Sequence, residues 1–574
     1  MIELSGKALA ASGVLLGAAL TALAALRGRI ELSLAKHPSL AGHARIARWV
    51  AARVPFYAYD EAQFFGTDGA PPALAARRHA AFMRLAALHA QRFARTAAAT
   101  ESIGASLPDW QLTAHYRVPF QFSELVRRHF KPTALASASQ GCELIDLDGN
   151  RLYDLTGSYG LNVFGVDHYR QCIERGADLV RELGPVLGTY HPVIAENTTR
   201  LRRISGLEQV SFHMSGTEAV MQAVRLARYH TRRRYLVRFC GAYHGWWGDV
   251  QPGAGNPTPS RDTLTLREMH PHTLRVLRNR RDIACVLVNP LQALHPNAAA
   301  PADSTLIDSA RAARFDPQAY RQWLRELREV CTARGIVLIF DEVFVGFRLA
   351  PGGAQEYFGV RADLVTYGKT VGGGLPIGVL CGRTELMRRF DPERPADICL
   401  ARGTFNSHPY VMGAMNEFLR QLESSGIQRH YRDLERTWNG RAQALNEQLA
   451  GAGLNVRVAA LSTIWTVYYP QPSRYNWMLQ YYLRAQGLAL SWVGTGRLIF
   501  SLTYSDAQFA EVAERFVAAA QQMHADGWWW EGSPGNRAIR RQVLKEMLLV
   551  RVRLRPSGRS APRAADTAVL GDKA

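Results

Sequence analysis

Short apolar runs alternate with amphipathic helical stretches through the middle of the chain. The run Ile336–Phe340 is rich in β-branched and aromatic residues and ends abruptly in Asp341-Glu342. A run of this kind is typical of a strand that is buried on both faces of a parallel sheet. Runs at 236–239, 283–289 and 362–366 have the same character, and 320–333 has the apolar spacing of a helix. The pattern predicts an α/β fold.

Two charged residues follow these predicted strands. Asp341 lies at the carboxyl end of its strand, and ligands bind at that edge of open α/β sheets. Lys369 follows the next apolar run and enters a turn with three glycines at 372–374. A lysine held next to apolar segments can have a lowered pKa and act as an amine nucleophile toward a carbonyl. Taken alone, the two residues could equally be a helix cap and a solvated loop lysine.

Three segments around these residues keep a fixed spacing. They are Asp341-Glu342-Val343, Gly346-Phe347-Arg348, and Tyr367-Gly368-Lys369 with the glycines and Pro376 that follow. Together they resemble the class III (ω-amino) pyridoxal-phosphate aminotransferases, most closely the glutamate-1-semialdehyde aminomutase branch. The resemblance covers roughly 108–523. It implies a fold-type I enzyme with pyridoxal 5'-phosphate as cofactor, a large and mostly parallel α/β domain, and a smaller split α+β domain.

The resemblance also implies roles for single residues. Lys369 and Asp341 would be catalytic: the lysine forms a Schiff base with the cofactor, and the aspartate keeps the ring nitrogen protonated so that the ring withdraws electrons. Ser215-Gly216-Thr217 opens a predicted helix, whose first N–H groups can hold a phosphate. The implied cofactor-binding residues are Ser215, Gly216, Thr217, Tyr243, Asp341, Val343, Lys369 and Thr404.

Two of these residues belong to further matching segments. Tyr243 begins a Tyr-His-Gly triplet whose aromatic ring would stack on the cofactor, whereas His244 could simply form a hydrogen bond within the fold. Thr404 belongs to 402–409, which resembles a motif whose threonine reaches the phosphate of the neighbouring subunit's cofactor. The resemblance therefore implies a homodimer with shared active sites.

One strand end departs from the family pattern. Relatives usually have a glutamate before the proline, whereas this chain has Asn289-Pro290. The change removes a negative charge near the expected cofactor edge and puts in doubt any substrate role carried over from that glutamate. The arginine that binds a substrate carboxylate is also undecided, since Arg117, Arg348 and Arg497 are all candidates.

Both ends of the chain combine apolar and basic residues. Residues 8–26 are uncharged and consist mainly of alanine and leucine, and basic residues follow from Arg27 onward. This predicts an anchor at 8–26 on the cytoplasmic face of a membrane. A buried or partner-packed helix and a cleaved signal peptide are the alternatives. The basic stretch 537–563 suits a helix lying on anionic lipid, but equally a solvated or dimer-packed helix.

These observations predict five segments. They are a helical N-terminal extension (1–107), a small subdomain made of 108–155 and 410–530, a large cofactor-binding domain (156–409), and a basic tail (531–574). We recognise no chemistry in residues 42–100, and the role of residues 42–107 stays open. The anchor at 8–26 would lie inside the extension.

The composition excludes some classes of function. Of the 574 residues, 69 are Lys or Arg and 49 are Asp or Glu, so the net charge is +20. Such an excess can indicate nucleic acid, an anionic membrane surface or merely an arginine-rich proteome, and no nucleic-acid module is recognisable. Seven single cysteines without a CxxC pair indicate reduced thiols in the cytoplasm and no metal site.

The leading hypothesis is an aminotransferase that moves an amino group between a small-molecule amine donor and an aldehyde or ketone acceptor through a Lys369 Schiff base. The acceptor could be apolar, or presented by a membrane or a carrier protein. An intramolecular aminomutase, which returns the amine to another carbon of the same molecule, is the first alternative. A non-catalytic scaffold is the second.

Overall fold

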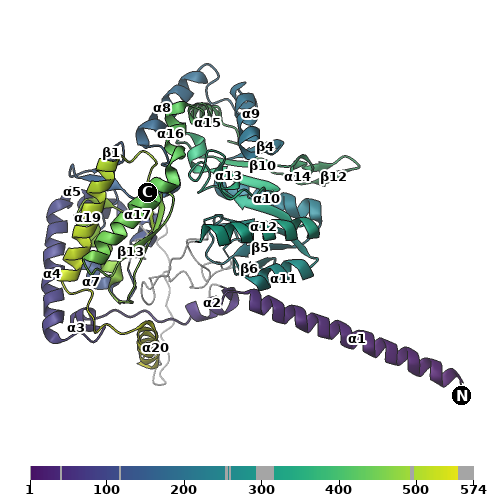
Figure 1. Cartoon of the computed structure of the whole chain (residues 1–574), viewed down its shortest axis with the longest axis horizontal. Coiled ribbons are helices and arrows are strands. Elements are labelled where there is room, and N and C mark those ends of the chain that lie inside the picture. Colours follow the sequence, from purple (N-terminus) through teal and green to yellow (C-terminus); the bar gives the residue numbers. More distant parts are fainter. Residues whose placement is uncertain are drawn as a thin grey trace, which may run out of the picture.

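The computed structural model describes residues 2–38, 42–115, 118–251, 256, 260–291, 316–490 and 497–553 (Figure 1). A seven-stranded sheet forms its centre, in the order β4-β10-β9-β8-β7-β5-β6. Only β10 runs antiparallel to its neighbours, so the predicted mostly parallel sheet is confirmed. The strands are β4 (Gln209–His213), β5 (Tyr235–Phe239), β6 (Thr263–Leu266), β7 (Ile283–Val288), β8 (Val337–Asp341), β9 (Leu364–Gly368) and β10 (Gly378–Gly382).

Helices cover both faces of this sheet, which explains why its central strands are apolar at every position. Leu338 and Phe340 of β8 pack in one cluster with residues of α12 (Pro317–Arg334). Val337 and Ile339 face the other way and pack in a second cluster with α10 (Gly216–Thr231). Because side chains alternate along a strand, each face needs its own apolar residues. The buried runs are therefore the expected signature of a two-sided sheet.

Two smaller sheets lie outside the central sheet, and one of them combines segments from before and after it in the chain. The hairpin predicted at 143–155 forms as β2 (Glu143–Asp146) and β3 (Arg151–Asp154), flanked by β1 (Ala136–Gln140) and β15 (Leu488–Ala489). The other sheet contains β13 (Arg457–Leu461), β14 (Ile464–Tyr468) and β16 (Arg497–Ile499). Since β15 pairs with β3, distant parts of the chain meet here, as a split small subdomain requires. The exact domain boundaries stay a prediction.

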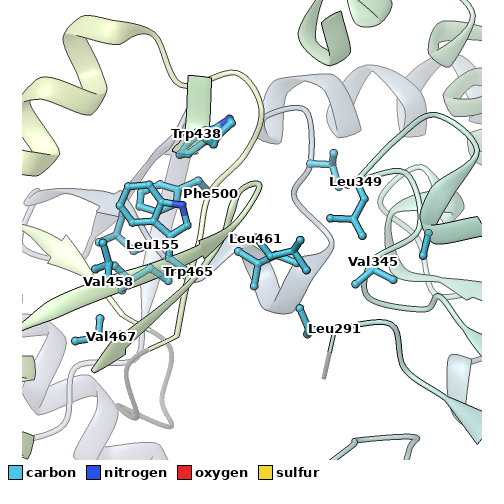
Figure 2. Packing of buried hydrophobic residues seen from close by; sticks show 14 of the residues in the cluster. Leu155, Leu291, Val345, Leu349, Trp438, Val458, Leu461, Trp465, Val467 and Phe500 are labelled. Atoms are coloured by element: carbon cyan, nitrogen blue, oxygen red, sulfur yellow. The ribbon is translucent and has the colours of Figure 1, made fainter. Parts of the chain in front are cut away.

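Aromatic packing holds helices against the second small sheet. Figure 2 shows Trp438 of α17 (Leu434–Gly451), Trp465 of β14 and Phe500 together. Each tryptophan ring lies 5.0 Å from the Phe500 ring, measured between centroids. Helix α19 (Asp506–Ala525) adds Phe509 to this group. Aromatic pairs at such distances contribute beyond the apolar area that they bury.

The remaining helices flank these sheets. They are α6 (Pro108–His115), α7 (Ser123–His129), α8 (Val166–Leu179), α9 (Val193–Ser205), α11 (Pro271–Asn279), α13 (Gly353–Phe358), α14 (Thr384–Met387), α15 (Pro409–Leu422), α16 (Ser425–Arg432) and α18 (Leu479–Ala485). A short hairpin of β11 (Phe390–Asp391) and β12 (Arg394–Ile398) extends from the large domain.

The N-terminal extension begins with a helix of 34 residues, α1 (Ile2–Ala35), whose free end projects from the molecule (Figure 1). Its other end packs on α11, whose Asn279 donates a hydrogen bond to Glu31 at 2.7 Å. The N–H of Arg267, directly after β6, donates one to the Ala35 carbonyl at 2.9 Å. Among the described residues, no helix has the length and apolarity that crossing a membrane requires. The prediction of a spanning segment at 8–26 is thus not supported.

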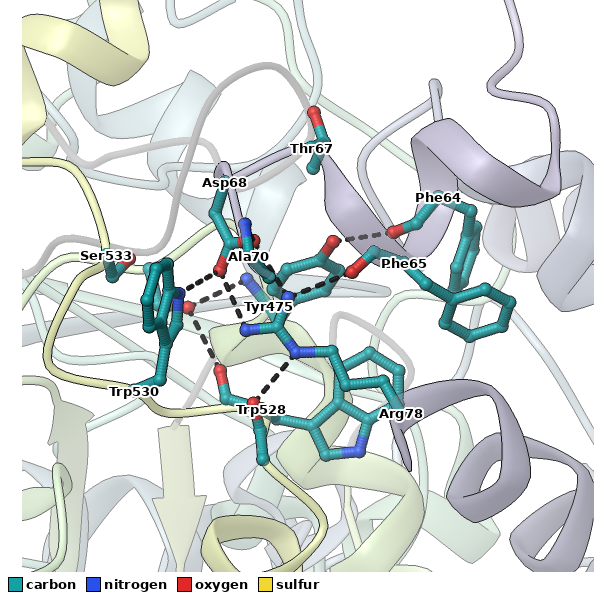
Figure 3. A network of polar contacts seen from close by, with 12 residues as sticks. Phe64, Phe65, Thr67, Asp68, Ala70, Arg78, Tyr475, Trp528, Trp530 and Ser533 are labelled. Atoms are coloured by element: carbon teal, nitrogen blue, oxygen red, sulfur yellow. Dashed lines mark hydrogen bonds and ion pairs between the residues drawn. The ribbon is translucent and has the colours of Figure 1, made fainter. Parts of the chain in front are cut away.

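The rest of the extension is joined to the C-terminal end of the fold. It consists of α2 (Ala44–Ala51), α3 (Glu61–Gly66), α4 (Pro72–Arg92) and α5 (Ala94–Gly104). Figure 3 shows Arg78 of α4 and Asp68, both fully buried, with both Asp68 oxygens accepting hydrogen bonds from the guanidinium at 2.8 Å. Trp530 donates to Asp68 at 2.7 Å, and Arg78 donates to the Gly527 carbonyl at 2.8 Å. The part of the extension around Asp68 and α4 therefore belongs to the folded core.

All seven cysteines are buried free thiols. Burial raises the pKa of Cys285 to about 12 and that of Cys240 to about 11. Such thiols stay protonated at neutral pH and are poor nucleophiles. The cysteines therefore serve as small core residues, in agreement with the reduced thiols predicted from the sequence.

Candidate active site

The predicted acidic residue lies at the carboxyl edge of the central sheet. Asp341 is the last residue of β8, and Thr366 of β9 is its neighbour in register. Its side chain is buried, and its Oδ1 accepts hydrogen bonds from the Val343 N–H at 3.1 Å and from the Thr366 hydroxyl at 3.3 Å. Its Oδ2 lies 2.7 Å from Nδ1 of His244. The carboxylate is thus held in one orientation at the sheet edge where α/β folds bind ligands.

The partner of Asp341 is the buried His244, for which the sequence allows a simple hydrogen bond within the fold. Burial lowers the pKa of His244 below its ordinary value, although the neighbouring Asp341 acts to raise it. The imidazole is therefore neutral at pH 7, and because a carboxylate only accepts, its proton must be on Nδ1. Within the described residues, Nε2 of His244 has no hydrogen-bond partner. The ring acts as a single donor that points at Asp341.

The candidate lysine lies one strand away. Lys369 follows β9 and begins a single 3₁₀ turn, η4 (Lys369–Gly372), with a backbone φ of 51°, a region that non-glycine residues avoid. A side-chain carbon at Gly373 would overlap the Ala414 carbonyl oxygen of α15, so the turn needs glycine to pack there. Burial lowers the pKa of Lys369, Asp341 opposes this shift, and Arg348 adds to it. More of the amine is therefore neutral, which is the nucleophilic form.

The predicted phosphate-binding turn lies beside the end of β8. Ser215 caps α10 by accepting a hydrogen bond from the Glu218 N–H at 3.3 Å, and the Glu218 carboxylate accepts one from the Met214 N–H at 2.9 Å. A side-chain carbon at Gly216 would lie 2.6 Å from the Val343 side chain. The start of α10 therefore packs directly on the segment that follows Asp341, with its positive end at the same sheet edge.

Tyr243 lies on the segment that follows β5. Its ring is 62% exposed, and its pKa is raised by partial burial and then by the charge of Asp341. Two residues later, Gly245 has φ of 88°, and a side-chain carbon there would overlap the side chain of Thr217. Thus Tyr243 approaches Asp341 while the following residues pack on the first turn of α10. Four of the predicted segments meet at one edge of the sheet.

The comparisons with known proteins agree with this geometry. Residues 126–520 match the family model of the class-III aminotransferases. The chain belongs to the class III aminotransferase family. It is therefore a pyridoxal-phosphate-dependent enzyme, as the sequence predicted.

Relatives of this class III aminotransferase include aminomutases and transaminases. The chain is 35% identical over 371 residues to the glutamate-1-semialdehyde 2,1-aminomutase of Methanothermobacter thermautotrophicus. The matched region covers 61% of this chain and 81% of the aminomutase. A solved transaminase with PLP bound is 27% identical and covers 69% of this chain and 92% of that one, with a TM-score of 0.57. A glutamate-1-semialdehyde aminomutase structure from Pseudomonas aeruginosa shares the fold at 18% identity, with a TM-score of 0.63 and coverage of 78% and 99%.

The residues at the sheet edge fit the family's cofactor. A buried carboxylate suits a protonated ring nitrogen, a helix start suits a phosphate, and an amine with a lowered pKa suits an aldehyde. The close approach of Gly216 to Val343 leaves no room for a larger residue at the start of α10. The individual roles of these residues stay predictions.

One predicted residue does not join the others within this chain. Thr404 is exposed on the segment between β12 and α15. In the part of the chain that the structure describes, no hydrogen bond links it to Lys369, Asp341 or α10. Its expected role lies in a partner subunit, so a single chain leaves that prediction untested.

The candidate arginines separate into different roles. Arg348 is fully buried, and its guanidinium donates to the carbonyls of Asn162 at 2.9 Å and Phe500 at 2.5 Å and to the Thr463 hydroxyl at 2.9 Å. It therefore joins the large domain to the small one and is not available to a substrate carboxylate. Arg117 lies outside the described residues. Of the two candidates that the structure describes, Arg497 is the one whose guanidinium is not engaged by the Asn162 and Phe500 carbonyls, and it lies 5.9 Å from the Phe344 ring centroid.

Phe344, an aromatic residue that no sequence motif singled out, lies close to both Arg497 and Lys369. The ring centroid of Phe344 lies 5.7 Å from the Lys369 amine and 5.9 Å from the Arg497 guanidinium. A side-chain carbon at Gly160 would overlap this ring, so the 157–160 turn packs against it. Phe344 directly follows the Asp341-Glu342-Val343 motif, and this position is the sequence feature that could have placed it at the site.

Asn289, where the chain departs from the expected family motif, also lies at the carboxyl edge of the central sheet. Val288 pairs with Phe340, so Asn289 follows β7 next to Asp341. Asn289 is buried, and its side-chain oxygen accepts a hydrogen bond from the Leu291 N–H at 3.3 Å. A neutral amide thus occupies the place where the family resemblance led us to expect a carboxylate.

Proposed function

We propose that this class III enzyme is an aminotransferase in which Lys369 holds the cofactor and then transfers the proton of the substrate carbon. Bound pyridoxal phosphate supplies an electron sink that stabilises negative charge at that carbon. The observation that carries the proposal is the placement of Asp341 and Lys369 at the ends of the neighbouring strands β8 and β9. Burial lowers the pKa of Lys369, which increases the fraction of its amine in the neutral, nucleophilic form.

The other residues in this proposal bind and orient. The buried Asp341 would keep a proton on the ring nitrogen, and the His244 hydrogen bond at 2.7 Å holds its carboxylate in position. The first N–H groups of α10, at Ser215, Gly216 and Thr217, bind the phosphate. Tyr243 would stack on the cofactor ring, and Val343 would also contact the cofactor. The substrates are a small-molecule amine donor and an aldehyde or ketone acceptor.

The proposed enzyme is a homodimer whose subunits complete each other's sites. Thr404 is exposed and lies apart from the other predicted residues. Such a position suits a residue that contributes to the site of the partner subunit. A two-fold dimer would pair both sites in the same way. Mixing subunits that carry Lys369→Ala with subunits that carry Thr404→Ala tests the dimer and the role of Thr404. The mixture should recover about a quarter to a half of the native activity.

An intramolecular aminomutase is the second candidate. It is favoured by the 35% identity to the Methanothermobacter thermautotrophicus aminomutase and by 37% identity over 307 residues to the aminomutase of Acetivibrio thermocellus. A mutase turns over one substrate without a second amine donor or acceptor. Incubation with glutamate-1-semialdehyde alone, followed by product analysis, separates the two candidates.

The central test is the identity of the lysine. Borohydride reduction of the holoenzyme should attach the cofactor covalently to the peptide that contains Lys369. Lys369→Ala should lose this attachment and lower the rate of the amine half-reaction by roughly 10²–10⁴-fold, the contribution of a positioned acid–base group. Lys131→Ala, on an exposed lysine paired with Glu101, is the matched control and should behave as the native enzyme. Attachment at another lysine would refute the proposal.

A further inference from the structure

Helices from both ends of the chain expose apolar side chains that the rest of the protein does not cover. Helix α2 has no buried residue, and Ile46 and Trp49 are 52% and 58% exposed. Helix α20 (Asn536–Arg553) exposes four residues by 51% to 68%: Leu544, Leu548, Leu549 and Val552. Helices α1, α2 and α20 lie along the lower edge of the molecule in Figure 1. Soluble proteins seldom leave large apolar groups clustered at the surface without a partner.

The apolar face of α20 points outward because the opposite face is already in use. Ile539 and Val543 are buried, and Glu546 accepts hydrogen bonds from Tyr57 at 2.8 Å and Tyr59 at 2.6 Å. Gln542 donates to the Thr67 carbonyl at 2.7 Å. These contacts fix the rotation of the helix. The exposed leucines are therefore a consequence of how α20 docks on the N-terminal extension.

Helix α1 likewise has one side packed on the protein and one side exposed. Its Leu32 packs against the core and Ala35 is buried, on the side that contacts α11. The opposite side carries five residues that are 49% to 65% exposed: Leu20, Leu23, Leu26, Ile30 and Leu34. Their spacing of three or four residues places them on one face of the helix.

The charged residues of α2, and those of α20 that do not face inward, are all basic. Arg45, Arg48 and Arg53 belong to α2 or follow it, and the Arg53 guanidinium lies 4.2 Å from the Trp49 ring. The only acidic residue of α20 is Glu546, which faces inward. The basic residues of α20 are Arg537, Arg540, Arg541, Lys545, Arg551 and Arg553.

We propose that α2, α20 and the exposed face of α1 form a surface that lies on an anionic lipid bilayer without crossing it. Helices with apolar residues beside Arg and Lys insert in this manner, and each basic residue is attracted to anionic headgroups. Tryptophan is favoured at the membrane interface, as Trp49 would be. A second copy of the chain fits this surface poorly, because two positive surfaces repel. This binding is independent of the proposed reaction.

Co-sedimentation of the full-length holoenzyme with vesicles tests the surface. Binding to phosphatidylcholine vesicles that contain phosphatidylglycerol should be at least about tenfold stronger than binding to pure phosphatidylcholine, and it should weaken as salt is added. The double variant Trp49→Glu/Leu548→Glu should lower binding to the anionic vesicles at least about tenfold. Leu179→Glu, at a 49%-exposed leucine of α8 on the opposite edge of the molecule, is the matched control and should leave binding unchanged.

The outcome is decisive in either direction. Visible cofactor absorbance and thermal unfolding should be the same in all variants, which shows that they are folded. Native protein that stays in the supernatant with anionic vesicles would overturn the proposal. The same conclusion would follow if the double variant bound as well as the native protein. If the double substitution instead abolished self-association in sedimentation velocity and native protein ignored both vesicle types, the surface would be a contact between copies of the chain.

Discussion

Replacement of His244 tests whether the orientation of Asp341 matters for the reaction. The two side chains are joined at 2.7 Å and are 0% and 4% exposed, so solvent does not weaken their interaction. A hydrogen bond to a charged group contributes about 1.5–3 kcal/mol. Since about 1.4 kcal/mol corresponds to a factor of ten, loss of the donor in His244→Phe should lower kcat/KM about 10- to 150-fold. His244→Asn retains an N–H donor and should recover part of this loss.

Two measurements distinguish positioning from general stability. The first is the rate of the amine half-reaction, followed by the change in cofactor absorbance with any donor that the native enzyme accepts. The second is the pH dependence of that absorbance, which should shift in His244→Phe because Asp341 no longer holds one orientation. His79→Phe, at an exposed histidine of the N-terminal extension, is the control. Equal activity in His244→Phe and native enzyme, or equal losses in the Phe and Asn variants, would refute the reasoning.

Two further predictions concern stability. Asp68→Ala leaves the buried Arg78 charge unpaired and should lower the free energy of unfolding by about 3–5 kcal/mol in urea titrations. The double variant Arg78→Met/Asp68→Leu should lower it much less than the two single changes added together. Additive losses would contradict a coupled pair. Burial lowers the pKa of His213 from 6.5 to about 4. Between these pH values the unfolded chain binds a proton that the folded chain does not, so the free energy of unfolding decreases as pH falls from about 6.5 toward 4. His213→Gln should remove this part of the loss, and stability-against-pH curves of the same shape for both proteins would show that His213 does not contribute it.

Much of the central sheet was predictable because its signals are local. Val337–Asp341 and Leu364–Gly368 are buried at every residue, and the apolar runs at 336–340 and 362–366 predicted them to within two residues. The hairpin at 143–155 was predictable for the same reason, since its turn contains Asp148-Gly149. A strand and the charged residue at its end lie in one short stretch of sequence.

Helix α1 shows where a local signal was insufficient. The run at 8–26 correctly predicted a helix, but its alanine-rich composition left its environment open. The contact of Glu31 with Asn279, 248 residues away, sets where the helix docks. No periodicity within 8–26 carries that information.

By itself, the sequence determined the buried strands, the strand-end residues Asp341 and Lys369, and the match to the family's motifs. Each of these depends only on residues that are close together in the sequence. Only the tertiary structure decided which distant groups meet. It placed His244 on Asp341 across 97 positions, and Trp530 on Asp68 across 462. It also assigned Arg348 to backbone carbonyls and not to substrate. The physical reason is that hydrogen bonds form in space, and the fold alone sets which side chains come within 3 Å of one another.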